Sequence, residues 1–302
     1  MNDMGERGGG LQEFPHGLGD DERGELIYGG AILVFKQVPA LTRLVRLCRQ
    51  MLTDTFPGAA PVHAQTVFPV DRYIPLVDDL QQRFNRDPEV KTLLCEALEH
   101  VGVVCSRTYW DRIHLRVVPY GGTHSGYQTR TLHHHRDTWA SNVYQQVNWW
   151  TPVYTLTAER TIALYPRYWS TAIENSSASW DLTELRRAKQ AAAAKHLSGF
   201  DYPVVARPLE PVDTSDELPV VIQPGDLLGF SAAHLHATVP NTTDVARFSI
   251  EFRTVSVEDF LWGRGAPNVD GRAPYVASSW FRHMLTGSGL DRHPVGSAAS
   301  AL

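Results

Sequence analysis

Hydrophobic positions in the first half of the chain recur with helical spacing. Between about 39 and 53 they lie three or four residues apart, which predicts an amphipathic helix. Its apolar positions are Leu41, Leu44, Val45, Cys48, Met51 and Leu52. A second apolar stripe covers 90–101, with Asp87 as a candidate N-cap and Pro88 suited to the first turn. Gly102 can end this helix, and we expect both helices to pack outside a sheet.

Beyond residue 110 the pattern changes to short apolar and β-branched runs bounded by Gly and Pro, which is typical of β-strands. The predicted strands span 113–118, 147–156, 161–165, 220–223, 227–230 and 247–255. One predicted helix, over 182–197, interrupts them. Many short strands with few βαβ units favour a mainly β fold, an antiparallel sandwich or jelly roll with flanking helices.

The two ends of the chain lack this patterning. Residues 1–24 are rich in Gly, Asp and Glu and predict a flexible arm, and the small, polar residues 286–302 predict a flexible tail. No internal repeat or long linker divides the part between them. We therefore expect one domain over 25–285, with core strands over about 110–256.

Composition narrows the function classes. The 302 residues are 43% hydrophobic, enough for a sizeable core, and a net charge of −5 argues against a non-specific nucleic-acid binder. No apolar run of about 18 residues suits a membrane span, and no signal-peptide pattern opens the chain. The three cysteines form no CxxC pair, so we expect no disulfide framework and a reducing, cytoplasmic location.

One short stretch carries residues suited to a metal. In His135-Arg136-Asp137, the first and third side chains would share one face of an extended strand and could hold one ion together. No other histidine of the chain has Asp or Glu two positions later. On the same strand Arg136 would face away from the metal, so we interpret it as a structural ion-pair partner.

A later segment supplies the remaining groups. Gly225-Asp226 predicts a turn into a buried strand, His236 follows, and Arg247 lies eleven residues beyond that histidine. Two histidines and one carboxylate leave three metal positions open on one side, as non-haem Fe(II) oxygenases require. An arginine nearby can hold the far carboxylate of a 2-oxo acid through two parallel hydrogen bonds.

Taken together, HRD at 135–137 and the later runs GDLLGF, HATVPN and RFS resemble the phytanoyl-CoA dioxygenase-like family of Fe(II)/2-oxoglutarate-dependent oxygenases. Counted from Gly225, the positions of His236, Asn241 and Arg247 match the family spacing. The resemblance implies a double-stranded β-helix, one Fe(II) ion, and oxidative decarboxylation of 2-oxoglutarate by O2 coupled to oxidation of a substrate.

Residue roles follow from the same resemblance. Arg247 would bind the distal carboxylate of 2-oxoglutarate, with the hydroxyls of Thr238 and Ser249 as partners. The implied iron ligands, which are also the catalytic centre, are His135, Asp137 and His236. The run TAERTIALYPRYW after the strand at 147–156 departs from a Gly-rich ending common in the family, which leaves the neighbouring loop and the substrate open.

Other histidines compete for these roles. His133 would share a strand face with His135, and His234 competes with His236 as the distal ligand. We prefer the pair with Asp137, because a carboxylate neutralises Fe(II), and the spacing favours His236. His134 would point away from the metal, with its ring solvated or hydrogen-bonded to a carbonyl.

Aromatic residues crowd the same part of the chain. Trp139 follows the ligand pair closely and is our preferred pocket residue. Trp149 and Trp150 must face opposite sides of one strand, so only one of them can line the cavity, and we assign Trp149 to it.

The family's halogenases replace the carboxylate ligand with Ala or Gly, so Asp137 favours hydroxylation, or a related desaturation or ring closure. The chain has no lysine-rich cluster, which argues against a CoA thioester and favours a small or medium-sized biosynthetic metabolite. Two rival functions are a cupin-type metal-dependent isomerase or hydrolase that does not use 2-oxoglutarate, and a non-catalytic jelly-roll binding module.

Overall fold

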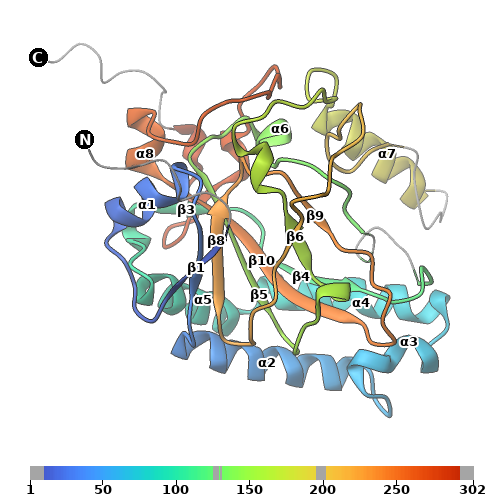
Figure 1. Cartoon of the computed structure of the whole chain (residues 1–302). Coiled ribbons are helices and arrows are strands. Elements are labelled where there is room, and N and C mark those ends of the chain that lie inside the picture. The colour runs from blue at the N-terminus through green and yellow to red at the C-terminus, as the bar shows by residue number, and fades with distance from the viewer. Residues whose placement is uncertain (1–9, 125–128, 130, 195–201, 293–302) are drawn as a thin grey trace, which may run out of the picture.

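The computed structural model describes residues 10–124, 129, 131–194 and 202–292, and its strands form two sheets (Figure 1). The larger sheet has the order β1 (Leu11–Phe14), β2 (Ile32–Phe35), β8 (Leu227–Ser231), β5 (Gln146–Pro152), β10 (Arg247–Ser256), β3 (Thr108–Trp110) and β11 (Arg282–His283), with β4 (His114–Val118) also paired to β10. The smaller sheet has the order β7 (Leu218–Pro219), β6 (Ile162–Leu164) and β9 (His236–Thr238). The β1–β2 pair is parallel, and the other pairs are antiparallel.

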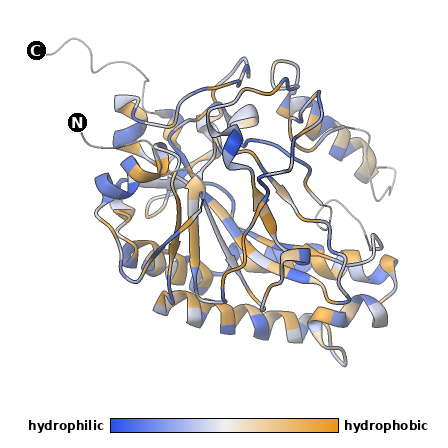
Figure 2. Ribbon diagram, in the orientation of Figure 1, coloured by the Kyte–Doolittle hydropathy of each residue, from blue (hydrophilic) through white to orange (hydrophobic). Residues whose placement is uncertain are grey.

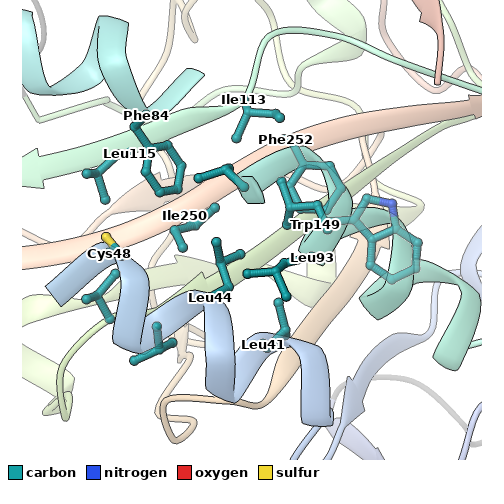
Figure 3. Packing of buried hydrophobic residues seen from close by; sticks show 14 of the residues in the cluster. Leu41, Leu44, Cys48, Phe84, Leu93, Ile113, Leu115, Trp149, Ile250 and Phe252 are labelled. Carbon is teal, nitrogen blue, oxygen red and sulfur yellow. The ribbon is translucent and has the colours of Figure 1, made fainter. Parts of the chain in front are cut away.

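The outer face of the larger sheet is covered by helices α2 (Pro39–Thr55), α4 (Val70–Arg86) and α5 (Pro88–His100). Figure 3 shows Leu41 and Leu44 of α2 and Leu93 of α5 pointing toward Ile250 and Phe252 of β10. The side chain of Asp87 accepts hydrogen bonds from two backbone N–H groups of the first turn of α5, as the N-cap prediction required. The prediction that the N-terminal helices pack outside the sheet is therefore confirmed.

A second apolar layer lies between the two sheets. Trp150 of β5 and Phe230 of β8 pack there against Ile162 and Leu164 of β6. Figure 2 shows hydrophobic stretches along β6 and β8, whereas both colours alternate along α2, because only one face of that helix is buried. The predicted fold class, a jelly-roll-type β core with flanking helices, is confirmed.

The remaining helices lie at the edges of this core. They are α1 (Asp20–Tyr28), α3 (Ala64–Val67), α6 (Thr138–Ser141), α7 (Leu182–Ala194) and α8 (Val257–Trp262). The predicted helix over 182–197 is α7, and residues 195–197 of that prediction lie outside the described part of the chain. Within the described residues, no helix has the length and apolar composition needed to cross a bilayer.

Three sequence predictions about these elements are wrong. Residues 1–24 are not a flexible arm throughout, since β1 pairs with β2 in the sheet and α1 begins at Asp20, while 1–9 lie outside the described residues. The predicted tail does not begin at 286, because Leu290 is fully buried and bonded to Phe281, while 293–302 lie outside the described residues. No strand covers 220–223, because the paired residues of this segment are Leu218–Pro219, which form β7 and end just before it. A single domain over 25–285 stays a prediction.

Candidate metal centre

The structure brings together the three predicted ligands from two distant segments. His135 and His236 form a β-bridge in which each backbone N–H donates to the other residue's carbonyl at 3.0 Å. Asp137 follows two residues later, and one donor atom from each of the three side chains lies within 4.8 Å of the others. One metal ion could therefore contact all three.

The two imidazoles are held in the same way. Nδ1 of His135 lies 2.7 Å from the carbonyl of His133, and Nδ1 of His236 lies 3.0 Å from the carbonyl of His234. A carbonyl can only accept, so each Nδ1 carries the proton and each Nε2 keeps its lone pair for a metal. Burial lowers the pKa of His135 to about 3, which keeps the ring neutral near pH 7.

Asp137 does not lie on an extended strand, so the strand geometry expected for the HxD motif is wrong. Its backbone is helical (φ −64°, ψ −30°), and it begins the short helix α6. The carboxylate still reaches the histidines, with Oδ1 3.8 Å from Nε2 of His135. The chain turns after the β-bridge at His135. This turn, and not the alternation of side chains along a strand, brings the side chains of His135 and Asp137 together.

Both oxygens of Asp137 have a hydrogen-bond donor. Nδ2 of Asn148, on β5, donates to Oδ2 at 2.6 Å, and Nη1 of Arg253, on β10, donates to Oδ1 at 3.3 Å. Burial raises the pKa of Asp137, but the nearby positive charge, Arg253 foremost, and the bond from Asn148 outweigh it and lower the pKa to about 2. The carboxylate is therefore ionised, as metal binding requires.

Arg253 belongs to a second ion pair. Its Nε lies 2.6 Å from Oδ2 of Asp111, a carboxyl whose pKa burial raises to about 6. Sequence reasoning missed Arg253, Asp111 and Asn148. One signal could have found the arginine: Arg247, Ser249, Glu251 and Arg253 alternate with apolar residues along β10, and three of them are charged. Arg247 and Ser249 of this face were assigned to the co-substrate, and its other two residues, Glu251 and Arg253, line the cavity.

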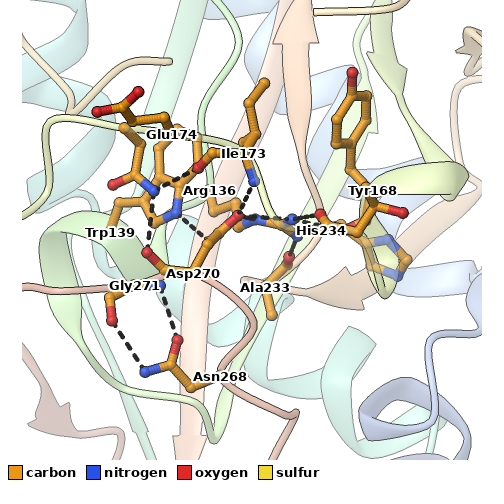
Figure 4. Close-up of polar contacts among 12 residues, drawn as sticks. Arg136, Trp139, Tyr168, Ile173, Glu174, Ala233, His234, Asn268, Asp270 and Gly271 are labelled. Atoms are coloured by element: carbon orange, nitrogen blue, oxygen red, sulfur yellow. Dashed lines mark hydrogen bonds and ion pairs between the residues drawn. The ribbon is translucent and has the colours of Figure 1, made fainter. Parts of the chain in front are cut away.

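Arg136, between two of the predicted ligands, is a structural ion-pair partner, as predicted. It is 2% exposed, pairs with Asp270 at 3.1 Å, and donates hydrogen bonds to the carbonyls of Ala233 and Tyr168 (Figure 4). It therefore ties the segment of the first two ligands to the segment that leads into His236.

Trp139 is not among the residues that line the cavity around the predicted ligands, so the preferred pocket residue was wrong. It is fully buried in a separate apolar cluster, and its Nε1 donates to Oδ1 of Asp270 at 2.6 Å. The indole of Trp149 packs toward the helices and donates to Thr254 at 2.8 Å, although the residue also contributes to the cavity wall. Trp150 and Asn148 of β5 line the same cavity, so Trp149 contributes to the wall as predicted, and the expectation that only one of the two tryptophans could do so is wrong.

A cavity of about 510 Å³ contains the three predicted ligands in its wall. The tryptophan and phenylalanine of the inter-sheet layer, Trp150 and Phe230, line it together with Ile162. Charged side chains from β4, from β10 and from Asp111 and Arg112, between β3 and β4, line it as well, including the pair Arg116–Glu251, joined at 2.8 Å. The metal centre would therefore sit in a pocket that is apolar on one side and ionic on the other.

The three residues predicted to bind 2-oxoglutarate are all buried, Thr238 on β9 of the smaller sheet and Arg247 and Ser249 on β10 of the larger sheet. Thr238 lines the cavity, whereas Arg247 and Ser249 are buried and are not among its lining residues. Arg247 donates from Nη1 to the carbonyl of Thr161 at 2.7 Å, and burial lowers its pKa to about 10. Among the described residues, Nε of Arg247 and Oγ of Ser249 have no hydrogen-bond partner.

The structure separates the competing histidines. The side chain of His133 is exposed, while that of His134 contacts the Tyr165 ring and has Nε2 buried without a partner among the described residues. The ring of His134 is half-buried, and its Nε2 is neither exposed to solvent nor bonded to a carbonyl, contrary to our expectation for that atom. His234 packs on Trp169 with ring centroids 4.5 Å apart and is not part of the three-residue group.

No protein-family model and no curated protein matches the chain, so membership in the phytanoyl-CoA dioxygenase-like family stays a prediction. Solved structures are similar at low identity. EvdO2 from Micromonospora carbonacea var. aurantiaca, complexed with 2-oxoglutarate, is 15% identical over 80% of this chain and 92% of that chain, with a TM-score of 0.45. EctD from S. alaskensis with bound Fe is 13% identical over 86% and 83%, with a TM-score of 0.40.

The epimerase SnoN, in complex with Fe3+, alpha ketoglutarate and nogalamycin RO, is 15% identical over 84% of this chain and 95% of that chain, with a TM-score of 0.41. At these identities and TM-scores the likenesses carry no conclusion about chemistry. The chemistry of this chain therefore rests on its own residues.

Proposed function

We propose that this chain is a non-haem Fe(II)- and 2-oxoglutarate-dependent dioxygenase that oxidises a C–H bond of a small or medium-sized biosynthetic metabolite and releases succinate and CO2. The observation that carries the proposal is the group of His135, Asp137 and His236, with donor atoms within 4.8 Å, in the wall of a cavity large enough for a metabolite. Two imidazoles and one carboxylate are the ligand set of such oxygenases.

The residues fit an iron ion. Nε2 of His135 and of His236 are free to coordinate, because Nδ1 of each is occupied by a carbonyl, and Asp137 is ionised. Three protein ligands leave open positions for a bidentate co-substrate and O2. When bound, Fe(II) supplies the O2 activation that amino-acid side chains cannot provide.

A buried dicarboxylate also fits. Nε of Arg247 and Oγ of Ser249 are buried polar atoms without partners among the described residues, and leaving such atoms unpaired costs about 1–3 kcal/mol each. A carboxylate that passed the cavity wall beside Thr238 could accept hydrogen bonds from both of them. We assign the distal carboxylate of 2-oxoglutarate to this position.

The chain's own residues then orient and protect the reacting groups. Asn148 and Arg253 hold the carboxylate of Asp137 in place through hydrogen bonds to its two oxygens. Trp150 and Phe230 supply apolar wall that limits water around the substrate. The presence of Asp137 favours hydroxylation over halogenation. We also propose a cytoplasmic location, which rests on the cysteine pattern alone.

The first test is spectroscopic. Anaerobic protein with Fe(II) should develop a weak visible charge-transfer band at about 500 nm when 2-oxoglutarate is added, because the co-substrate chelates the metal. Asp137→Ala and His135→Ala should lose this band and the release of succinate. His133→Ala is the matched control, since its side chain is exposed and the variant should keep both.

The same measurement separates the rival functions. Tight metal binding without a band on addition of 2-oxoglutarate would favour a cupin-type isomerase or hydrolase. A chain that binds no divalent metal would favour a non-catalytic binding module. Either result would overturn the proposal.

A further inference from the structure

Two of the three cysteines lie next to each other near the end of α5, although they are not neighbours in the chain. Cys95 belongs to α5, and Cys105 begins the short 3-10 helix η2 (Cys105–Arg107). The thiol of Cys105 donates to the backbone carbonyl of Cys95, with Sγ 3.7 Å from the oxygen. Both thiols are free in the structure. The fold thus makes a cysteine pair that no CxxC spacing indicates.

A tight turn at Gly102 causes this approach, because it folds the chain back onto the helix. The backbone N–H of Gly102 donates to the carbonyl of Glu99 at 3.0 Å, and that of Val103 donates to the carbonyl of Leu98 at 2.9 Å. Gly102 has φ +89°, which glycine adopts without strain. The two cysteines are therefore held close by the way in which α5 ends.

The two thiols have different surroundings. Cys105 is 2% exposed and belongs to the apolar cluster beneath the N-terminal helices, whereas Cys95 is half-buried at the edge of that cluster. The hydrogen bond between the two thiols lowers the pKa of Cys95, against the effect of burial, and together with burial it raises the pKa of Cys105. An accessible, more acidic thiol beside a second cysteine is typical of pairs that peroxide oxidises.

The backbone allows the two sulfur atoms to meet. A disulfide needs the two Cβ atoms within about 4.5 Å of each other. Sγ of Cys105 already contacts the backbone of Cys95, so rotation of the two side chains and a small adjustment of the turn bring the sulfurs together. No helix or strand has to move to another place.

We propose that Cys95 and Cys105 form an oxidation site that hydrogen peroxide converts into a disulfide. The thiolate of Cys95 attacks one oxygen of the peroxide, the O–O bond breaks, and hydroxide leaves, so that Cys95 becomes a sulfenic acid. The thiol of Cys105 then attacks this sulfur, the S–O bond breaks, and the leaving hydroxide takes the thiol proton. Two thiols are oxidised to one disulfide while one peroxide is reduced to two waters. Such a disulfide is transient in a reducing compartment.

The test treats the full natural chain with hydrogen peroxide, unfolds it and labels the remaining thiols with iodoacetamide. Trypsin cleaves after Lys91 and Arg107 and nowhere between them, so both cysteines lie in one peptide, residues 92–107. Mass spectrometry should find this peptide without labels and lighter by two hydrogen atoms, and dithiothreitol should restore both labels. Cys48, fully buried on α2, is the internal control and should stay labelled.

Single variants distinguish the roles of the two cysteines. Cys105→Ser should leave a sulfenic acid at Cys95 that dimedone traps, whereas in Cys95→Ser the thiol of Cys105 should stay reduced. Retention of both labels in the natural chain would overturn the proposal, as would equal oxidation of Cys48 or a disulfide between two chains. None of these measurements needs a metal or 2-oxoglutarate, so the result is independent of the proposed oxygenase activity.

Discussion

The side chain of Asp137 is the residue on which the proposed chemistry most depends, and two neighbours control its position. Asn148 holds one oxygen and Arg253 the other, and Arg253 is itself held by Asp111. Partners of this kind orient a metal ligand without touching the metal.

We expect Asn148→Ala to lower the affinity for a divalent metal by about 10–100-fold, because Asp137 loses the donor to Oδ2. Titration calorimetry with Fe(II) or Mn(II) measures this. Arg107→Gln, which removes an exposed ion pair with Glu258, is the control and should bind metal like the natural chain. Equal affinity in both variants would contradict the orienting role of Asn148.

The position of 2-oxoglutarate leads to a second prediction. Arg247→Gln should raise the KM for 2-oxoglutarate about 10–100-fold, since a charge-assisted contact contributes about 1.5–3 kcal/mol. Arg116→Gln is the informative comparison, because Arg116 lines the cavity and pairs with Glu251. A larger rise in KM for Arg116→Gln would show that Arg116 binds the distal carboxylate.

At the scale of elements, the loop around Asp270 is joined to the metal-binding segments. Asp270 accepts from Arg136 and from the indole of Trp139, and it also accepts from the backbone N–H of Ile173 (Figure 4). The side chains of Arg136 and Asp270 are 2% and 5% exposed, so water does not solvate either charge and each is neutralised by the other.

We therefore expect Asp270→Asn to lower the free energy of unfolding by about 3 kcal/mol, because it leaves the buried Arg136 charge without its partner. Urea unfolding followed by circular dichroism measures this. Asp213→Asn, at an exposed ion pair with Arg167, should cost less than about 1 kcal/mol. Similar losses in the two variants would contradict the structural role of the buried pair.

The end of α5 depends on a glycine. Gly102 has φ +89°, and a Cβ there would overlap the backbone carbonyl of Leu18. Gly58 has φ +79° with open space around it, so substitution there measures only the cost of placing a side chain on a left-handed backbone. We expect Gly58→Ala to destabilise by about 1 kcal/mol and Gly102→Ala by clearly more, measured by urea unfolding. Equal losses would show that Leu18 moves aside freely.

At the scale of the whole molecule, buried histidines make stability depend on pH. Burial lowers the pKa of His114 to about 3, and the nearby Arg116 and Arg253 act in the same direction, while Glu251 opposes them. In the unfolded chain the pKa is about 6.5. As pH falls below about 6.5 the unfolded chain gains a proton that the folded chain refuses, so stability is lost toward acid.

We expect the free energy of unfolding to fall between pH 7 and pH 5, and to fall less steeply in His114→Asn. Urea unfolding of both chains across this range, under identical metal conditions, measures the difference. Parallel curves for the two chains would contradict a neutral His114 in the folded state.

Much of the fold followed from local patterns. The stripes in α2 and α5, the cap at Asp87 and the strands β4, β5, β8 and β10 were predictable, because apolar periodicity and capping act within a few residues. Helix α4 and strands β1 and β2 were not predicted. Pro75 lies inside α4 and β1 has little apolar character, which obscures both patterns, whereas β2 is an apolar run, ILVF, that the local pattern could have predicted.

For the site, the sequence by itself determined which residues could bind a metal and how far apart they lie in the chain, since these depend on side-chain chemistry and motif spacing. Only the tertiary structure brought His135, Asp137 and His236 together and set His234 apart. It also turned the charged face of β10 toward a cavity instead of solvent. A strand with one face toward a cavity and a strand with one face toward solvent show the same alternation of polar and apolar residues. Only contacts between distant segments decide what covers each face.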